Sequence, residues 1–356
     1  MRSLPVLSVL VSIVLLPATV AAATYVVNPE GSGDYATIQA AVDAANHGDT
    51  IELTNGVFTG VGNRDIDYLG KSITIRSQGG IAHACVVDCQ SQGRGFIFQS
   101  GEGPLAILER LMVRNGRAAE YGGGVYILDG SDPTLIDCVF ADNWSGYAGG
   151  GVACMSYCAP LVSGCLFIEN TADNATGTGH GGGMHCGNYS YATLRDCLFA
   201  GNSATWRGGG FHCHNYSNAS LENCTFYGNR CVAGGGIGLR NVASVSISNT
   251  IVAFSGEGSG VHCEPGTSAM LDCCAVYGNA GGDWVGCIAE QLGLRGNIHA
   301  DPLFCDPAGG DYSLNGNSPC APGNNPGCGL IGALGVGCGP TATRRVTWGE
   351  VKAAFR

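Results

Sequence analysis

Two short phrases recur through the middle of the sequence at matching intervals, and this double repeat constrains the fold more than any other feature. The first phrase is three residues rich in glycine followed by an apolar residue, at Val125, Val152, Met184, Phe211, Ile237 and Val261. The second ends on a polar residue, at Asn143, Asn170, Asn202, Asn229, Ser255 and Asn279. Both series advance by 27, 32, 27, 26 and 24 residues. Phrases that share one variable period indicate stacked supersecondary units, with the length variation confined to one loop per unit.

The composition excludes several classes of protein. Glycine supplies 59 of 356 residues, which suits short strands joined by tight turns and disfavours long helices. A hydrophobic content of 45% with only 13% charged residues excludes a disordered chain. The net charge of −11 argues against nucleic acid and anionic membrane surfaces as partners.

Each unit reads as three short strands separated by corners. The first strand follows the glycines, the second ends near Leu135 or its equivalents, and the third carries the Cys-x-Phe-x-x-Asn phrase. Residues that tolerate left-handed backbone angles occupy the corner before the third strand, at Asp137, Gly164, Asp196, Asn223 and Asn249. The prediction is an all-β, right-handed, single-stranded parallel β-helix, in which equivalent side chains form columns about 4.8 Å apart.

Two kinds of column are expected inside the coil. Asn143, Asn170, Asn202 and Asn229 should point inward and hydrogen-bond along their column. Two cysteine positions alternate with apolar residues and should hold buried free thiols, at Cys154, Cys186, Cys213 and Cys263 and at Cys138, Cys165, Cys197, Cys224 and Cys274. The better disulfide candidates lie in loop-like surroundings, with their pairing left open. They are Cys85, Cys89, Cys158, Cys287, Cys305, Cys320, Cys328 and Cys338, and Cys154 is an alternative candidate beside Cys158.

The ends of the chain predict a signal peptide, two caps and a tail. Residues 1–23 read as a secretory signal peptide, so the mature protein is expected to be secreted or held at the cell surface. The β-helix should span 24–338, with an N-terminal cap at 24–50, coils at 51–300 and a Cys- and Pro-rich C-terminal cap at 301–338. Within 33–53, Asp34 should cap a short helix, Gly48 should stop it, and Ile38, Ala41, Val42 and Ala45 should lie on its apolar face. Residues 339–356 form a separate tail with a possible short helix.

These phrases resemble known families. The segment G-D-Y-A-T-I-Q-A-A-V-D-A-A-N-H-G-D-T-I-E-L is similar to the N-terminal cap of the pectin-lyase-like right-handed β-helix superfamily. The paired G-G-G-[VMFI] and F-x-x-N phrases are similar to the repeats of polymorphic outer membrane proteins, which are implicated in adhesion. The resemblance covers about residues 25–338. It implies the fold, and it leaves activity open because the superfamily includes lyases, hydrolases and adhesins.

Candidate functional residues lie on the outer face of the first strand, where enzymes of the resembled superfamily usually act. His185 and His212 should be vertical neighbours there, with His214 on the same face and Arg240 and Glu264 on later coils. Three interpretations compete: solvated residues of a recurrent repeat, a sugar-binding strip, or a metal site. The strip would use Tyr157, Tyr189, Tyr216, Trp144 and Trp206, together with the three histidines. The metal site would use His185, His212 and His214, with zinc or copper as the ion.

Catalysis has weaker support in the residues. A calcium-assisted lyase needs clustered acids and a base, and this face offers Glu264 with Arg240 one coil away, besides His185 and His212. The Gly179-His180-Gly181 sequence is interpreted as a chance likeness to a hydrolase motif. The preferred hypothesis is a non-catalytic exported protein that binds glycans or other cell-surface partners without a cofactor. A polysaccharide lyase or glycoside hydrolase acting on acidic, pectin-like polysaccharide is the alternative, with calcium or zinc as the possible ion, and a histidine-column metal-binding protein is the second alternative.

Overall fold

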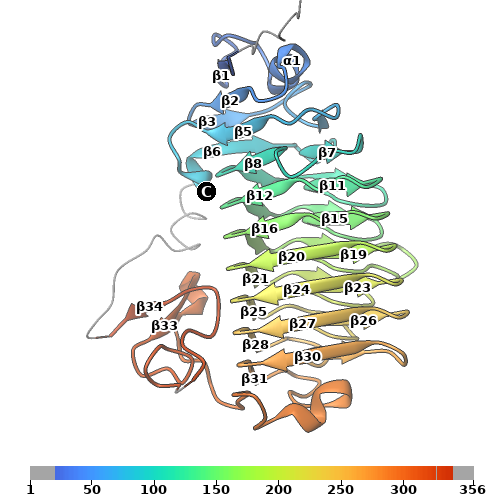
Figure 1. The fold of residues 1–356 in the computed structure, drawn as a ribbon, viewed down its shortest axis with the longest axis vertical. Coiled ribbons are helices and arrows are strands. Elements are labelled where there is room, and N and C mark those ends of the chain that lie inside the picture. Colours follow the sequence, from blue (N-terminus) through green and yellow to red (C-terminus); the bar gives the residue numbers. More distant parts are fainter. Residues whose placement is uncertain (1–20, 326, 340–356) are drawn as a thin grey trace, which may run out of the picture.

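The computed structural model describes residues 21–325 and 327–339, which wind into a parallel β-helix (Figure 1). The expected signal peptide lies outside these residues apart from 21–23, and the expected tail lies outside them apart from Gly339. No helix in the described residues is long and apolar enough to cross a membrane.

Four parallel sheets run along the coil, and each is defined here by its strands. Sheet A contains β1 (Thr24–Val27), β2 (Thr50–Leu53), β5 (Thr74–Ser77), β8 (Ile107–Glu109), β12 (Thr134–Ile136), β16 (Leu161–Ser163), β20 (Tyr191–Arg195), β24 (Asn218–Glu222), β27 (Ser244–Ser248) and β30 (Ser268–Asp272). Sheet B contains β3 (Gly56–Phe58), β6 (Cys85–Asp88), β9 (Met112–Arg114), β13 (Val139–Ala141), β17 (Leu166–Ile168), β21 (Leu198–Ala200), β25 (Thr225–Tyr227), β28 (Ile251–Ala253) and β31 (Ala275–Tyr277). Sheet C contains β4 (Ile66–Asp67), β7 (Phe96–Phe98), β11 (Val125–Leu128), β15 (Val152–Met155), β19 (Met184–Gly187), β23 (Phe211–His214), β26 (Ile237–Arg240) and β29 (Val261–Cys263). Sheet D contains β10 (Arg117–Ala118), β14 (Trp144–Ser145), β18 (Thr171–Ala172) and β22 (Ser203–Ala204).

A complete winding passes through sheets C, A, B and, in the middle coils, D before the glycine turn begins the next winding. The three predicted strands per unit correspond to sheets C, A and B. The short strands of sheet D were not predicted; three of them, β14, β18 and β22, begin directly after a residue of the asparagine column. The corner between sheets A and B is left-handed as predicted, with φ between 47° and 65° at Asp137, Gly164, Asp196, Asn223 and Asn249.

The predicted asparagine column is confirmed. Asn143, Asn170, Asn202 and Asn229 are at most 1% exposed. The Asn170 Nδ2 atom donates to Asn202 Oδ1 at 2.9 Å, and Asn202 Nδ2 donates to Asn229 Oδ1 at 2.9 Å. The same oxygens accept the backbone N–H groups of the preceding coil, at 3.0 Å for Asn170 and 2.9 Å for Asn202. The column therefore satisfies backbone donors that the bend before sheet D would otherwise bury without partners.

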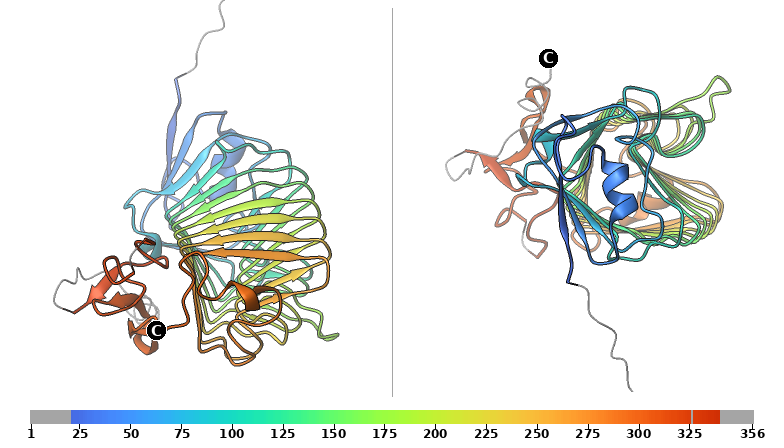
Figure 2. Two further views of the ribbon diagram at one scale, coloured as in Figure 1. Left: turned by 60° about the horizontal axis from the view of Figure 1, so that its bottom comes forward. Right: turned by 90° about the horizontal axis from the view of Figure 1, so that it is seen from above.

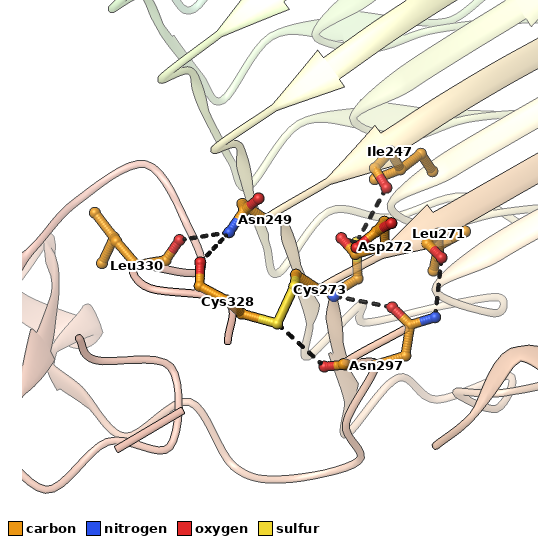
Figure 3. Close-up of a disulfide and its surroundings, with 10 residues drawn as sticks. Ile247, Asn249, Leu271, Asp272, Cys273, Asn297, Cys328 and Leu330 are labelled. Atoms are coloured by element: carbon orange, nitrogen blue, oxygen red, sulfur yellow. Dashed lines mark hydrogen bonds between the residues drawn. A yellow bond between two sulfur atoms is a disulfide. The ribbon is translucent and has the colours of Figure 1, made fainter. Parts of the chain in front are cut away.

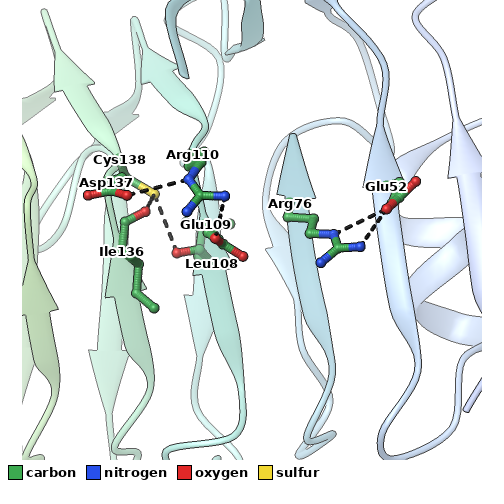
Figure 4. Close-up of polar contacts among 8 residues, drawn as sticks. All are labelled: Glu52, Arg76, Leu108, Glu109, Arg110, Ile136, Asp137 and Cys138. Atoms are coloured by element: carbon green, nitrogen blue, oxygen red, sulfur yellow. Dashed lines mark hydrogen bonds and ion pairs between the residues drawn. The ribbon is translucent and has the colours of Figure 1, made fainter. Parts of the chain in front are cut away.

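The core between the sheets is built from apolar columns and thiols. Phe140, Phe167, Phe199 and Phe226 stack with ring centroids 4.3 to 5.2 Å apart. The expected column of free thiols at Cys138, Cys165, Cys197, Cys224 and Cys274 is confirmed, because each is buried and unpaired. Figure 4 shows the Cys138 thiol, which donates to the Leu108 and Ile136 carbonyl oxygens at 3.4 and 3.3 Å.

The other cysteine expectations hold in part. Cys154, Cys186 and Cys213 are buried free thiols as expected, but Cys263 of the same column forms a disulfide with Cys287. Cys305 pairs with Cys338, and Cys328 pairs with Cys273. The expectation of disulfides at Cys85, Cys89, Cys158 and Cys320 is wrong, because all four are buried and free.

The N-terminal cap is the single α-helix of the described residues, α1 (Ile38–Ala44), which lies across the first coil (Figure 2). Its buried face consists of Ile38, Ala41 and Val42, as predicted. The helix begins later than predicted: Thr37 is the N-cap and its hydroxyl accepts from Ala40 N, whereas Asp34 accepts from Val26 N on β1. It also ends earlier, because Ala45 is the C-cap and Gly48 lies beyond it.

Side chains cover the free edge of the last strand of sheet A at the other end of the coil. Leu271 N donates to Gln291 Oε1, and Asn297 Nδ2 donates to Leu271 O (Figure 3). Gln291 ends a short 3-10 helix, Gly286–Gln291, whose Ile288 is fully buried in the core. These amides occupy the hydrogen bonds that an exposed edge would offer to another chain.

The Cys- and Pro-rich C-terminal segment packs outside the coil, beside sheet B (Figure 2). It contains the 3-10 turn Pro307–Gly309 and a small sheet of β32 (Phe304–Asp306), β33 (Asp311–Asn315) and β34 (Val336–Cys338). Tyr312 and Leu334 cover an apolar strip on the outer face of sheet B, and Asn249 Nδ2 donates to the Cys328 and Leu330 carbonyl oxygens. The segment is stapled as predicted, and the end of the coil itself is closed by the preceding residues.

Candidate functional site

The three tyrosines expected in a sugar-binding strip form an exposed row at the corner between sheets C and A. Tyr157, Tyr189 and Tyr216 have ring centroids 5.2 Å apart and interplanar angles of 9° and 5°. Their exposed fractions are 68%, 40% and 46%. The row lies entirely on the surface, so its hydroxyl groups and outer ring edges are open to a ligand.

The backbone of this corner holds the rings in register. Asn188 and Tyr189 both have positive φ, at 55° and 64°, and Asn215 and Tyr216 repeat this geometry at 57° and 59°. Asn215 Nδ2 donates to Asn188 Oδ1 at 2.7 Å beneath the row. Asparagine adopts left-handed angles more readily than most residues, so each Asn-Tyr pair turns the chain sharply and projects the ring outward.

The row ends at residues without aromatic rings. By the strand register, Gly130 lies one coil before Tyr157, and its amide donates to Ser156 O at 2.9 Å. Val242 occupies the equivalent corner one coil after Tyr216 and is 48% exposed. One face of the Tyr157 ring is therefore not stacked on another aromatic ring, which agrees with its higher exposure.

A shallow hollow of about 250 Å³ on the outer face of sheet A adjoins the tyrosine row. Tyr191, Thr193, Asn218 and Ser220 line it from β20 and β24. Sequence reasoning missed these residues, although Tyr191 follows Tyr189 by two positions and strand alternation would have placed it outward. Further toward α1, Glu52 and Arg76 form an ion pair on the same face at 2.6 Å, and Arg110 and Asp137 form one at 3.4 Å at the corner that follows sheet A (Figure 4).

His185 and His212 are vertical neighbours, as the repeat predicts, but they are not solvated. Their Cα atoms pair across β19 and β23, and the two side chains are 1% and 0% exposed. The glycine turn of each winding closes over the outer face of its own strand. Gly181 and Gly208 have φ of 59° and 63°, and a Cβ at either position would lie 3.0 or 2.9 Å from the histidine Cβ. The interpretation of this column as solvent-exposed is therefore wrong.

Residues that precede the glycines complete a buried cluster around these histidines. The His180 ring stacks on His212 at 4.7 Å and contacts Trp206 at 5.2 Å, and His180 is 2% exposed. The Arg207 guanidinium lies 3.8 Å from the centroid of the Trp206 ring. The interpretation of Gly179-His180-Gly181 as a chance likeness assigns His180 no place in this cluster, and Arg207 was not predicted there. The repeat could have indicated that His180 and Arg207 lie on neighbouring coils. One position of the repeat is occupied in successive coils by Tyr121, Ala148, His180 and Arg207.

Burial keeps these imidazoles neutral. It lowers the pKa of His185 and His212 well below the ordinary value, and it lowers the pKa of His180 to about 3, with the nearby Arg207 charge adding to the effect. The Nδ1 atoms of His185 and His212 are 3.0 Å apart. One ring must therefore donate through Nδ1 and the other must accept, so the pair consists of opposite tautomers.

Arg240 and Glu264, the other catalytic candidates, belong to an ion-pair network. Glu264 accepts from Arg207 through Oε1, and its Oε2 lies 3.4 Å from Arg240 Nε. The Arg240 guanidinium also lies 5.0 Å from the Trp206 ring centroid. Glu264 therefore has two cationic partners, and its charge is already compensated within the protein.

The expected histidine metal site is not assembled. Across 21–325 and 327–339, no three His, Cys, Asp or Glu side chains are grouped so that they could hold a metal ion. His185 and His212 direct their Nδ1 atoms at one another, and His214 stacks on His212 with ring centroids 5.8 Å apart. These donors do not converge on a common point, so the residues do not fit zinc or copper.

The two tryptophans are separated from the tyrosine row by the width of sheet C. Trp144 begins β14 in sheet D, where the Arg117 guanidinium lies 4.0 Å from its ring centroid. Trp206 follows β22 on the glycine-turn side of sheet C, whereas the tyrosines follow sheet C on its other side. The structure therefore splits the predicted sugar-binding strip into an exposed tyrosine row and a mostly buried Trp–His–Arg cluster.

Comparison with protein-family models supports the fold. A family model described as a right-handed β-helix region matches residues 171–298. The crystal structure of pectate lyase Pel9A aligns over 88% of this chain and 96% of its own, with a TM-score of 0.49 and 12% identity. Pectin methylesterase from carrot aligns over 80% of this chain and 91% of its own, with a TM-score of 0.34 and 11% identity. No curated protein matches the sequence. The coil is right-handed, as predicted, and these likenesses transfer no activity.

Proposed function

We propose that this is an exported protein that binds extended glycan chains without altering them, through the tyrosine row and the adjoining outer face of sheet A. The observation that carries the proposal is the row itself. Tyr157, Tyr189 and Tyr216 are exposed and aligned by the repeat, and aromatic rings with hydroxyl groups are effective contacts for sugars.

The geometry of the row suits a polymer more than a single sugar. The ring hydroxyls recur with the coil, at a ring spacing of 5.2 Å, and Tyr157 offers a ring face at the end beside Gly130. Tyr191, Thr193 and Ser220 add hydroxyl groups on the neighbouring face of sheet A. A chain laid across several coils would therefore meet the same contacts repeatedly.

Binding is preferred over catalysis because the candidate catalytic groups are poorly placed to reach a substrate. His185 and His212 are buried under the glycine turns, and Glu264 is paired with two arginines. The net charge of −11 also disfavours a general attraction to acidic polymers. Neither calcium nor zinc enters this proposal.

Export and a role at the cell surface belong to the proposal too. The expected signal peptide and the resemblance to adhesin repeats support them. A protein displayed outside the cell would meet glycans or glycosylated surfaces as its partners.

Affinity electrophoresis in gels containing soluble xylan, β-glucan or polygalacturonan tests the binding. At least one polysaccharide should retard the full-length protein, and Tyr189→Ala and Tyr216→Ala should each reduce the retardation. Val242→Ala is the matched control, because Val242 occupies the next corner of the same row without a ring. Equal retardation of all variants, or none on a broad glycan array, would remove the proposal.

A polysaccharide lyase or glycoside hydrolase is the second candidate. The observation in its favour is the partial exposure of Arg240 and Glu264 beside Trp206, at 33% and 24% of each side chain. Incubation with polygalacturonan should then release unsaturated or reducing ends, and Arg240→Gln should stop the release. Turnover that survives this substitution would exclude the proposed residue.

A further inference from the structure

A cleft of about 400 Å³ lies at the end of sheet A farthest from α1. It opens between the outer faces of β27 and β30 and the loop 291–297. The residues that line it include Ser244, Ser246, Ser268, Met270, Leu294 and Arg295. Its volume falls within the range of sites that hold small organic ligands, about 300–1,000 Å³.

The wall of this cleft is held rigidly. Gln291 bridges two backbone groups of β30, accepting from Leu271 N and donating to Ala269 O, each at 2.8 Å. The Arg295 carbonyl accepts from Cys273 N at 2.8 Å. Gly296 packs against the Cys273–Cys328 disulfide so closely that a side chain there would collide with Cys328 Sγ (Figure 3). The loop is therefore preformed, and a ligand would bind without ordering it.

The cleft combines exposed apolar groups with one cationic group. Met270 on β30 is 56% exposed, and Leu294 on the loop 291–297 is 58% exposed, although both line the same cleft. Arg295 is exposed, and it has no ion pair with any acidic residue in the described part of the chain. The Ser244 and Ser268 hydroxyls are 3.0 Å apart and share one hydrogen bond, so one of them keeps its O–H free to donate to a ligand.

We propose that this cleft binds a small organic anion with an apolar body, such as an aromatic or short acyl carboxylate or sulfonate. The apolar body would lie between Met270 and Leu294, and the anionic group would pair with Arg295, with the serine hydroxyls as further donors. The protein is acidic overall, so selection of an anion depends on this local guanidinium and not on a general field. The site is separate from the tyrosine row and does not depend on glycan binding.

Paired fluorescent probes test the charge and the apolar contact separately. Anilinonaphthalene sulfonate carries an anionic group, and N-phenyl-naphthylamine has a similar apolar body without it. Each probe is titrated into the full-length protein. Arg295→Gln should weaken sulfonate binding by about fivefold, the effect of losing a partly screened ion pair, and should leave the neutral probe unchanged. Leu294→Ser should weaken both probes.

Arg195→Gln is the matched control, since Arg195 is also an exposed arginine on the outer face of sheet A. It should change neither titration. Within 21–325 and 327–339 the Arg295 side chain forms no hydrogen bond or ion pair, and its backbone carbonyl is retained in the variant. Folding should therefore be preserved, and the melting temperature verifies this. Sulfonate affinity that is unchanged in Arg295→Gln, or lowered equally in Arg195→Gln, would overturn the proposal.

Discussion

Replacing Asn202 by alanine tests whether the asparagine column stabilises the coil. The Asn202 side chain accepts from Asn170 N and Asn170 Nδ2 and donates to Phe167 O and Asn229 Oδ1, at 2.8 to 3.0 Å. Each buried hydrogen bond contributes about 1 kcal/mol, and the Asn170 N–H would lose its acceptor at a position that is fully buried. The free energy of unfolding should therefore fall by about 4 kcal/mol, a large part of the total for most domains.

Urea unfolding followed by circular dichroism measures this change. The midpoint for Asn202→Ala should move to lower urea with little change in slope, because the surface exposed on unfolding is nearly the same. Asn218→Ala is the control, since Asn218 lies half-exposed on β24, and such surface changes usually alter stability by less than about 0.5 kcal/mol. A loss below about 1 kcal/mol for Asn202→Ala would refute the column as a source of stability.

Three further predictions follow from burial and covalent links. Burial lowers the pKa of His185 and His212 in the folded protein below the ordinary value of 6.5, so the unfolded chain binds more protons in acid. The contribution of these histidines to stability should be constant above about pH 7 and should fall below about pH 6.5, by up to about 1.4 kcal/mol per pH unit for each histidine. His212→Gln should make this decline shallower in melting curves taken across pH, and an unchanged slope would contradict the assignment. A thiol reagent should label none of the thirteen free cysteines in the native protein and all of them in denaturant, because all thirteen are buried. At Cys85, for example, burial also raises the thiol pKa to about 12. Rapid native labelling would show that the core is open. Cys328→Ser should lower stability by about 4 kcal/mol, the chain-entropy value for a link that spans 55 residues, and an unchanged melting temperature would argue against it.

The sequence repeat predicted the coil because every residue that determines a corner or a column recurs in phase. Asn170 and Asn202 lie at the same point of successive windings, and their hydrogen bonds follow from that register. Sheet D was missed because strands such as Thr171–Ala172 are too short to show alternation. The cap at Thr37 was placed at Asp34 because both residue types suit an N-cap, and only the contact of Asp34 with β1 distinguishes them.

The site was harder to predict because burial depended on the turn before the strand. Strand alternation placed His185 and His212 outward, and that direction is right. The positive φ of Gly181 and Gly208 then folds the preceding residues over the same face. The disulfide between Cys273 and Cys328 was also missed. Cys273 takes the corner position of the last coil, but Cys328 lies outside the repeat and reaches it only when the C-terminal segment packs against sheet B.

The repeating bonds of the asparagine column make each winding interchangeable with its neighbours. Excision of residues 144–170, one period between Asn143 and Asn170, would bring Asn143 directly above Asn202 with the same donors and acceptors facing each other. Coil number is therefore a free variable of this architecture. Gene duplication or deletion in whole periods can lengthen or shorten the tyrosine row, and with it the length of polymer that one molecule spans, without redesigning either cap.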